Sequence, residues 1–193
     1  MLKQVHQSRR GFLKAGGATA AGIAILGVAG VAAPGGEHYD AFLEGESPTA
    51  LSNKEFAVLT VASETLIGQA GDLPSVRETR TAARIDRELS MVQGRLLTDV
   101  KASLLYIEYA PMLAGFGSRF TCMASSERTA YMERLSHTDD ALERSIFFGL
   151  RFLTIFFFYS DNRTWNHLGY GGPLVDAKFY SAGNRIENLE GLT

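Results

Sequence analysis

The sequence predicts an all-α fold: a single helical domain of about five helices with an irregular aromatic C-terminal loop, preceded by a signal peptide. Three observations predict it. Apolar residues recur at three-to-four spacing, as in Phe56, Leu59 and Leu66, which places them on one face of a helix. Serine or aspartate residues that can cap a helix stand before such stretches. No stretch maintains the alternation of apolar and polar residues that is typical of a half-buried strand.

Residues 1–33 are predicted to be a twin-arginine signal peptide. Residues 1–14 carry four basic residues and no acid, and residues 15–33 are an uncharged run of small and apolar residues, which is the order of parts in a signal peptide. The residues that match the twin-arginine pattern are Ser8, Arg9, Arg10, Phe12, Leu13 and Lys14. Gly30 and Ala32 suit cleavage after Ala32, which implies a periplasmic mature protein. A permanent membrane anchor is the alternative, because the uncharged run nearly spans a bilayer.

The expected mature chain is acidic. The whole chain has 19 Lys+Arg and 21 Asp+Glu, and residues 1–33 hold four of the basic residues, so residues 34–193 have 15 basic against 21 acidic residues and a net charge of −6. This argues against nucleic acid or an anionic membrane surface as a partner, since both bind clustered positive charge. Cys122 is the only cysteine, so no disulfide framework or cysteine-ligated cluster is expected. It is interpreted as a buried, inert thiol.

The helical domain is expected over residues 51–193, after a flexible leader. The leader, residues 34–50, is rich in Gly, Glu and Pro. The first helix opens with Ser52 and with Glu55 three residues later. This spacing is a capping box, in which each side chain satisfies a free amide at the helix start. Gly68 begins the turn that ends this helix.

Two further helices follow. One is expected from Ser75 or Thr79 to Met91, with its apolar residues on one face and its charged residues outward. The next begins at Arg95, after a glycine that breaks the pattern. Pro111 and the glycines after it are predicted to end that helix.

The last two helices differ in composition. Ser125 or Ser126 caps a short amphipathic helix, and Asp139 or Asp140 starts a long helix that ends near Tyr159. The long helix is rich in phenylalanine and apolar almost all round. Because a helix apolar on every side is buried on every side, it is either the central helix of the domain or has one face covered by another protein.

No residue set in the chain is typical of a catalytic, cofactor or metal site. No glycine loop follows a strand, and the Glu-x-x-His pairs of a di-metal bundle do not occur. Glu133 and His137, four residues apart, are too few ligands to hold a metal. Glu108 is expected to pair with a basic group such as Arg151 or to lie at the rim of the core. We therefore expect no cofactor in this chain.

Several segments occur in the order typical of a known family. They are Leu51-Ser52-x-x-Glu55, the run from Val61 to Ile67, Pro74, the run from Ala82 to Leu89, and Trp165-x-x-Leu168-Gly169-Tyr170-x-Gly172-Pro173. On these segments the chain resembles the gluconate 2-dehydrogenase subunit 3 family, the small subunits of membrane-associated sugar dehydrogenases. The resemblance covers roughly residues 52–173, and the segment from Trp165 to Pro173 is its most specific part. One departure is Ile67-Gly68, where family members often have Ile-Pro.

The resemblance implies a non-catalytic small subunit. Such subunits bind a large FAD-containing oxidoreductase of the glucose–methanol–choline type, which often passes electrons to a cytochrome c subunit. The large subunit has no export signal of its own, and the small subunit carries it through the twin-arginine translocon. FAD would therefore belong to the large subunit.

The aromatic C-terminal loop, with part of the phenylalanine-rich helix beside it, is the segment expected to contact the large subunit. Its residues are Trp165, Leu168, Gly169, Tyr170, Gly172 and Pro173. Trp and Tyr are favoured anchors at interfaces, and glycines let another backbone approach closely. The alternative is that Trp165 packs inward and only holds the domain together. Two other interpretations of the whole chain stay open, namely a stand-alone periplasmic helical protein or enzyme, and a membrane-anchored scaffold that keeps residues 15–33.

Overall fold

The computed structural model describes residues 36–69 and 71–172, which form helices joined by turns, with no strand among them; this confirms the all-α prediction. The α-helices are α2 (Gly36–Asp40), α3 (Asn53–Ile67), α4 (Thr81–Ser90), α5 (Arg95–Leu113), α6 (Ser125–Ser136) and α7 (Ala141–Tyr159). Three short 3₁₀ helices are η1 (Phe120–Cys122), η2 (Asn162–Thr164) and η3 (Asn166–Leu168). The predicted signal residues Ser8, Arg9, Arg10, Phe12, Leu13 and Lys14 lie outside the described residues.

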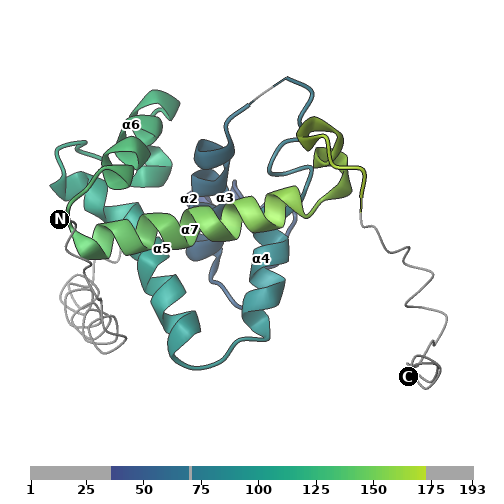
Figure 1. Cartoon of the computed structure of the whole chain (residues 1–193). Coiled ribbons are helices and arrows are strands. Elements are labelled where there is room, and N and C mark those ends of the chain that lie inside the picture. The colour runs from purple at the N-terminus through teal and green to yellow at the C-terminus, as the bar shows by residue number, and fades with distance from the viewer. Residues whose placement is uncertain (1–35, 70, 173–193) are drawn as a thin grey trace, which may run out of the picture.

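The central helix of the domain is α3, and the other α-helices pack around it (Figure 1). The predicted capping box forms at its start, where the Ser52 hydroxyl accepts a bond from the Glu55 amide and the Glu55 carboxylate accepts one from the Ser52 amide at 2.8 Å. Every residue from Glu55 to Ser63 is buried. The helix ends where predicted, because Gly68 has a φ of +68°, in the left-handed region that favours glycine.

The helices α4 and α5 diverge from the turn at residues 91–94 as two arms of a V (Figure 1). Gly94 has a φ of +77°, so the predicted break falls where the backbone needs a glycine. Pro111 lies inside α5, which continues to Leu113. The helix therefore ends between Pro111 and Gly115, among the residues predicted to end it, and a proline in the last turn removes one amide bond without stopping the chain from completing that turn.

Helix α7 lies across α3 and α4 and buries only one of its faces (Figure 1). Its buried residues are Ile146, Phe147, Leu150, Thr154 and Phe158. The hydroxyls of Thr154 and Ser63 share a buried hydrogen bond of 3.0 Å, which fixes α7 against α3. The Asp140 carboxylate caps the helix by accepting bonds from two amides of its first turn. Helix α7 is therefore not the central helix of the domain, because α3 takes that position. It keeps an outward face.

Residues 36–51, called the strap below, pack against the helical body where the sequence predicts a flexible leader over residues 34–50. The carboxylate of Asp86 on α4 accepts bonds from the amides of Thr49, Ala50 and Leu51 at 2.7, 3.1 and 2.8 Å, and from the Thr49 hydroxyl at 2.9 Å. Asp86 is 4% exposed, and a buried carboxylate needs such donors in place of water. The back of the strap is therefore held to α4 by hydrogen bonds to a buried side chain.

A second buried carboxylate holds the front of the strap. Glu108 on α5 is fully buried and accepts bonds from the Tyr39 hydroxyl at 2.9 Å, the Thr121 hydroxyl at 2.8 Å and the Thr121 amide at 3.1 Å. Burial, and then the neighbouring carboxylate, raise the pKa of Tyr39 far above its usual value. The expected pairing of Glu108 with Arg151 is wrong, because Arg151 is exposed on α7. Arg119 instead donates to the Tyr39 hydroxyl at 2.9 Å.

Glu143, in the first turn of α7, joins that helix to α5 and α6. Its carboxylate accepts bonds from Arg134 at 2.8 Å, from the Tyr106 hydroxyl at 2.8 Å and from the Thr138 hydroxyl at 2.7 Å. Burial alone would raise the pKa of Glu143, but these three donors outweigh it and hold the pKa below its usual value. A carboxyl of this kind stabilises the fold above its unfolded pKa, and the contribution disappears as pH falls through the folded pKa.

We expect Glu143→Gln to destabilise the protein by about 1–2 kcal/mol at pH 7, because the charge-assisted bonds are lost. The gap to wild type should shrink as pH falls below about 4.3, the unfolded pKa of glutamate, since protonation then removes the same bonds from wild type. Thermal melts of both proteins from pH 7 to pH 3 measure this. A gap of constant size across that range would show that the carboxylate charge does not contribute.

Candidate functional site

Three phenylalanines lie in a row on the outward face of α7, one helical turn apart. Phe148, Phe152 and Phe156, called the phenylalanine row below, are 50%, 65% and 57% exposed. The rings of Phe152 and Phe156 stack with centroids 5.9 Å apart. Large apolar side chains that are exposed next to one another mark binding surfaces, whereas single ones do not.

The size of the phenylalanine row fits a binding surface. It extends about 12 Å along the helix, at 1.5 Å per residue. Taking about 200 Å² for each ring, the three side chains expose roughly 350 Å². This lies in the range of about 300–600 Å² for the largest apolar patch on a typical monomer, which is often functional.

The two edges of the phenylalanine row differ. On one edge stand Arg144 and Arg151, which are seven residues apart and therefore on the same side of the helix. Arg144 donates to two backbone carbonyls before the helix, each at 3.3 Å. None of the ion pairs among residues 36–69 and 71–172 includes Arg151. On the other edge Gly149 is exposed, and no atom lies within 4 Å of the place a Cβ would occupy.

The predicted interface loop folds into a corner at the C-terminal end of α7, called the aromatic corner below. The rings of Trp165 and Tyr170 meet edge to face with centroids 5.2 Å apart, and a Cβ on Gly172 would lie 3.5 Å from the Trp165 ring. The Trp165 indole donates to the carbonyl of Tyr159, the last residue of α7, at 3.1 Å. Trp165 thus holds the corner to the end of the helix.

Other predicted interface residues lie on the outside of this corner. Leu168 and Tyr170 are 53% and 47% exposed. Gly169 is also exposed and has a φ of +65°, so glycine suits the turn there. Pro173 lies outside the described residues. The structure therefore brings Trp165, Tyr170 and Gly172 together and leaves Leu168 and Tyr170 free to contact another molecule.

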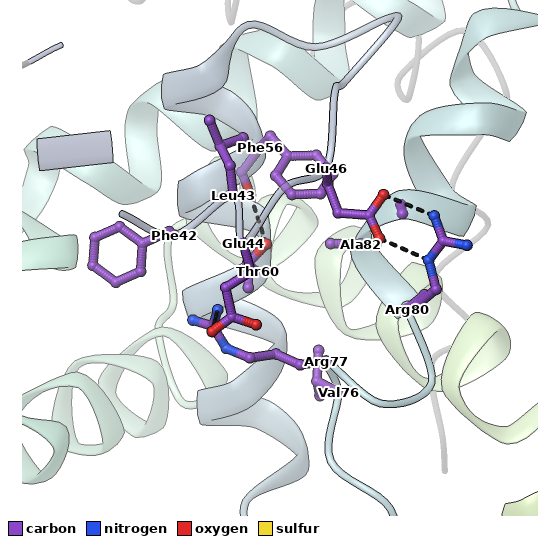
Figure 2. Close-up of a pocket in the computed structure, with 11 residues that line it drawn as sticks. Phe42, Leu43, Glu44, Glu46, Phe56, Thr60, Val76, Arg77, Arg80 and Ala82 are labelled. Atoms are coloured by element: carbon purple, nitrogen blue, oxygen red, sulfur yellow. Dashed lines mark hydrogen bonds and ion pairs between the residues drawn. The ribbon is translucent and has the colours of Figure 1, made fainter. Parts of the chain in front are cut away.

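A small pocket lies between the strap, α3 and α4 (Figure 2). Ion pairs cross it, with Arg80 donating to Glu46 at 2.7 and 2.8 Å, and Arg77 paired with Glu44 (Figure 2). Its volume is about 170 Å³, which is below the roughly 300–1,000 Å³ of a typical ligand pocket. Both arginines already have carboxylate partners from the strap, so this pocket fits a role in holding the strap.

Cys122 is exposed, so the interpretation of it as a buried thiol is wrong. It ends η1, and its sulfur lies 3.5 Å from Nε2 of His38 and 3.6 Å from a guanidinium nitrogen of Arg119. The tendency of free cysteines to be buried could not reveal this position, because the strap that brings His38 here is itself placed by distant residues. The contact joins the front of the strap to η1.

In residues 36–69 and 71–172, the structure places no three His, Cys, Asp or Glu side chains where they could hold a metal ion together. Over the same ranges, no helix combines the length and apolar character needed to cross a bilayer. No protein family model, no curated protein and no solved structure matches this chain.

Proposed function

We propose that this chain is a non-catalytic subunit of an exported oxidoreductase complex. It binds a large FAD-dependent dehydrogenase subunit of the glucose–methanol–choline type and carries it through the twin-arginine translocon to the periplasm. FAD and the oxidation of the substrate belong to that large subunit, and a cytochrome c subunit is the further member that the family resemblance implies.

The phenylalanine row is the observation that carries this proposal. When a helix is apolar on its outward face as well as on its inward face, contact with another molecule is favoured because it removes the outward face from water. At about 25 cal/mol per Å², removing roughly 350 Å² of apolar surface from water favours association by several kcal/mol before the costs of association are counted. A subunit that acts by binding another protein needs such a surface.

The export half of the proposal rests on the sequence before the described residues. Arg9 and Arg10 stand in the twin-arginine pattern, ahead of an uncharged run. Because the twin-arginine route carries folded proteins, a partner already bound to this chain can cross the membrane with it. A single signal then serves two chains.

We expect the double variant Arg9→Lys, Arg10→Lys to leave both this chain and its flavin partner in the cytoplasm. The signal is read as an arginine pair and not as positive charge, so lysine does not replace it. The measurement is fractionation of cells that make both chains, with each fraction blotted for both and assayed for protein-bound FAD.

Lys3→Arg, which makes the same chemical exchange outside the pair, is the matched control and should leave export unchanged. A flavin partner that still reaches the periplasm in the double variant would remove the escort role. Continued export of this chain itself would show that Arg9 and Arg10 are not its export signal.

A further inference from the structure

We propose that the outward face of α7 docks onto a separate protein whose apolar surface carries a carboxylate positioned for Arg151. This inference rests on the proposed function for the identity of that protein, the flavin subunit. It differs from the sequence prediction in placing the centre of the interface on the phenylalanine row and the aromatic corner at its end.

Arg151 determines the chemistry of the partner. It stands one residue before Phe152 and three after Phe148, so a surface that covers these rings also takes the guanidinium out of water. A charge removed from water is strongly unfavourable unless a partner charge replaces the water. A carboxylate matches the planar guanidinium with two parallel hydrogen bonds. The covering surface is therefore apolar with an Asp or Glu at this edge.

A second copy of this chain that pairs through the same face of α7 does not supply that carboxylate. The only acidic residue of α7 is Glu143, and its oxygens already accept bonds from Arg134, Tyr106 and Thr138. In an antiparallel two-fold pair centred on Phe152, the same edges of the two helices meet, and Arg151 faces its own copy. Like charges in contact disfavour such a pair.

A lipid surface also fits this face poorly. Binding to anionic lipids is typical of clusters of four to eight basic residues. The edge of the phenylalanine row has two, Arg144 and Arg151, and residues 34–193 have a net charge of −6. A protein surface that carries an acidic group beside apolar groups matches both the phenylalanine row and Arg151.

The aromatic corner extends the face at one end. Tyr159 lies seven residues after Phe152, on the same side of α7, and the Trp165 indole is bonded to its carbonyl. The exposed side chains of Leu168 and Tyr170 therefore lie near the end of the row. A stable interface buries about 800 Å² on each partner, so the roughly 350 Å² of the rings needs such neighbouring residues to complete it.

The first experiment identifies what covers the row. The photo-cross-linker p-benzoylphenylalanine replaces Phe152 in the full chain, made in its native host, and replaces Leu113 as the control. Leu113 is 77% exposed on α5, away from α7 in sequence. The proposal expects an adduct from position 152, and none from position 113, that contains FAD and joins an acidic peptide of a different polypeptide.

The other outcomes overturn the proposal or separate it from the proposed function. An adduct with residues 173–193 of the same chain, with a second copy or with lipid would overturn the docking face. An adduct with a different protein that lacks FAD and is not exported with this chain would uphold the face and remove the proposed function.

The second experiment tests the carboxylate. Phe152→Ser and Arg151→Glu should each weaken binding to the purified flavin subunit at least thirty-fold, about 2 kcal/mol. Arg151→Lys should lose less, because the charge remains while the bidentate geometry is lost. Leu113→Ser should bind like wild type, and all four variants should melt within a few degrees of wild type. Wild-type binding by both Phe152→Ser and Arg151→Glu would place the interface elsewhere while leaving the escort function intact.

Discussion

Replacing Glu108 by alanine is expected to lower the free energy of unfolding by about 4 kcal/mol and the melting temperature by roughly 15 °C. The alanine would leave the Tyr39 hydroxyl and the Thr121 amide inside the protein without the acceptor that they share in the native structure. Each buried donor without a partner costs about 1–3 kcal/mol. Thermal melts of the purified protein measure the loss, and limited proteolysis should show new cuts within the strap.

Two variants separate the buried network from a general effect of losing a glutamate. Glu108→Gln keeps one acceptor oxygen and turns an amide nitrogen toward the donors, so we expect about half the loss of the alanine variant. Glu133→Ala removes an exposed glutamate from α6 and should change the melting temperature by only a degree or two. A melt of Glu108→Ala close to that of wild type would contradict the assignment of Glu108 to the strap.

Replacing Asp86 by alanine is expected to release the back of the strap at a cost of about 3 kcal/mol. Three backbone amides and one hydroxyl, all from Thr49 to Leu51, donate to this single carboxylate. Without it the turn has no internal acceptor and opens to water, because unsatisfied buried amides are unfavourable. Amide hydrogen exchange measured by mass spectrometry should speed up at least tenfold for peptides that cover residues 46–51.

The comparison for this prediction is Asp99→Ala. Asp99 is an aspartate on α5 whose side chain is 51% exposed and pairs with Arg95, a type of surface pair that contributes less than about 1 kcal/mol. Its exchange pattern over residues 46–51 should match wild type. If Asp86→Ala speeds exchange evenly over the whole domain and not first in the strap, the carboxylate supports the core and not the strap.

The parts of the fold that the sequence predicts correctly depend on signals that act within one helical turn. Ser52 and Glu55 satisfy each other's amides, Asp140 caps the first turn of α7, and Gly94 supplies a left-handed backbone. Each of these effects involves neighbours in the sequence, so residue type and spacing are enough to identify them. The starts of α3 and α7 and the break at Gly94 could therefore be predicted, whereas α4 begins at Thr81 and the N-cap of α6 is Ala124.

The strap could not be predicted in the same way. Its own composition of Gly, Glu and Pro is typical of a flexible segment, and its order comes from Asp86 and Glu108, which lie far along the chain. A carboxylate in a helix gives no sign of which distant donors it will meet. The sequence therefore predicts the wrong partner for Glu108. It predicts Arg151, whereas Tyr39 and Thr121 donate to Glu108 in the structure.

The candidate site, too, can be predicted from the sequence only in part. The number of phenylalanines in α7 indicates that the helix exceeds what a small domain can hide. Which of them face outward depends on α3 taking the centre of the domain, and a helix that is apolar all round carries no periodicity from which to identify its inward face. Phe148, Phe152 and Phe156 could be identified only from the packing.

The strap has a consequence for the time course of synthesis. It is the first described part of the chain to be made, yet its partners come much later: Tyr39 needs Glu108, 69 residues on, and His38 needs Thr121, 83 residues on. At about 5–20 residues per second, roughly 4–17 s of translation separate His38 from Thr121. The strap therefore reaches its final place only after the ribosome has passed residue 121.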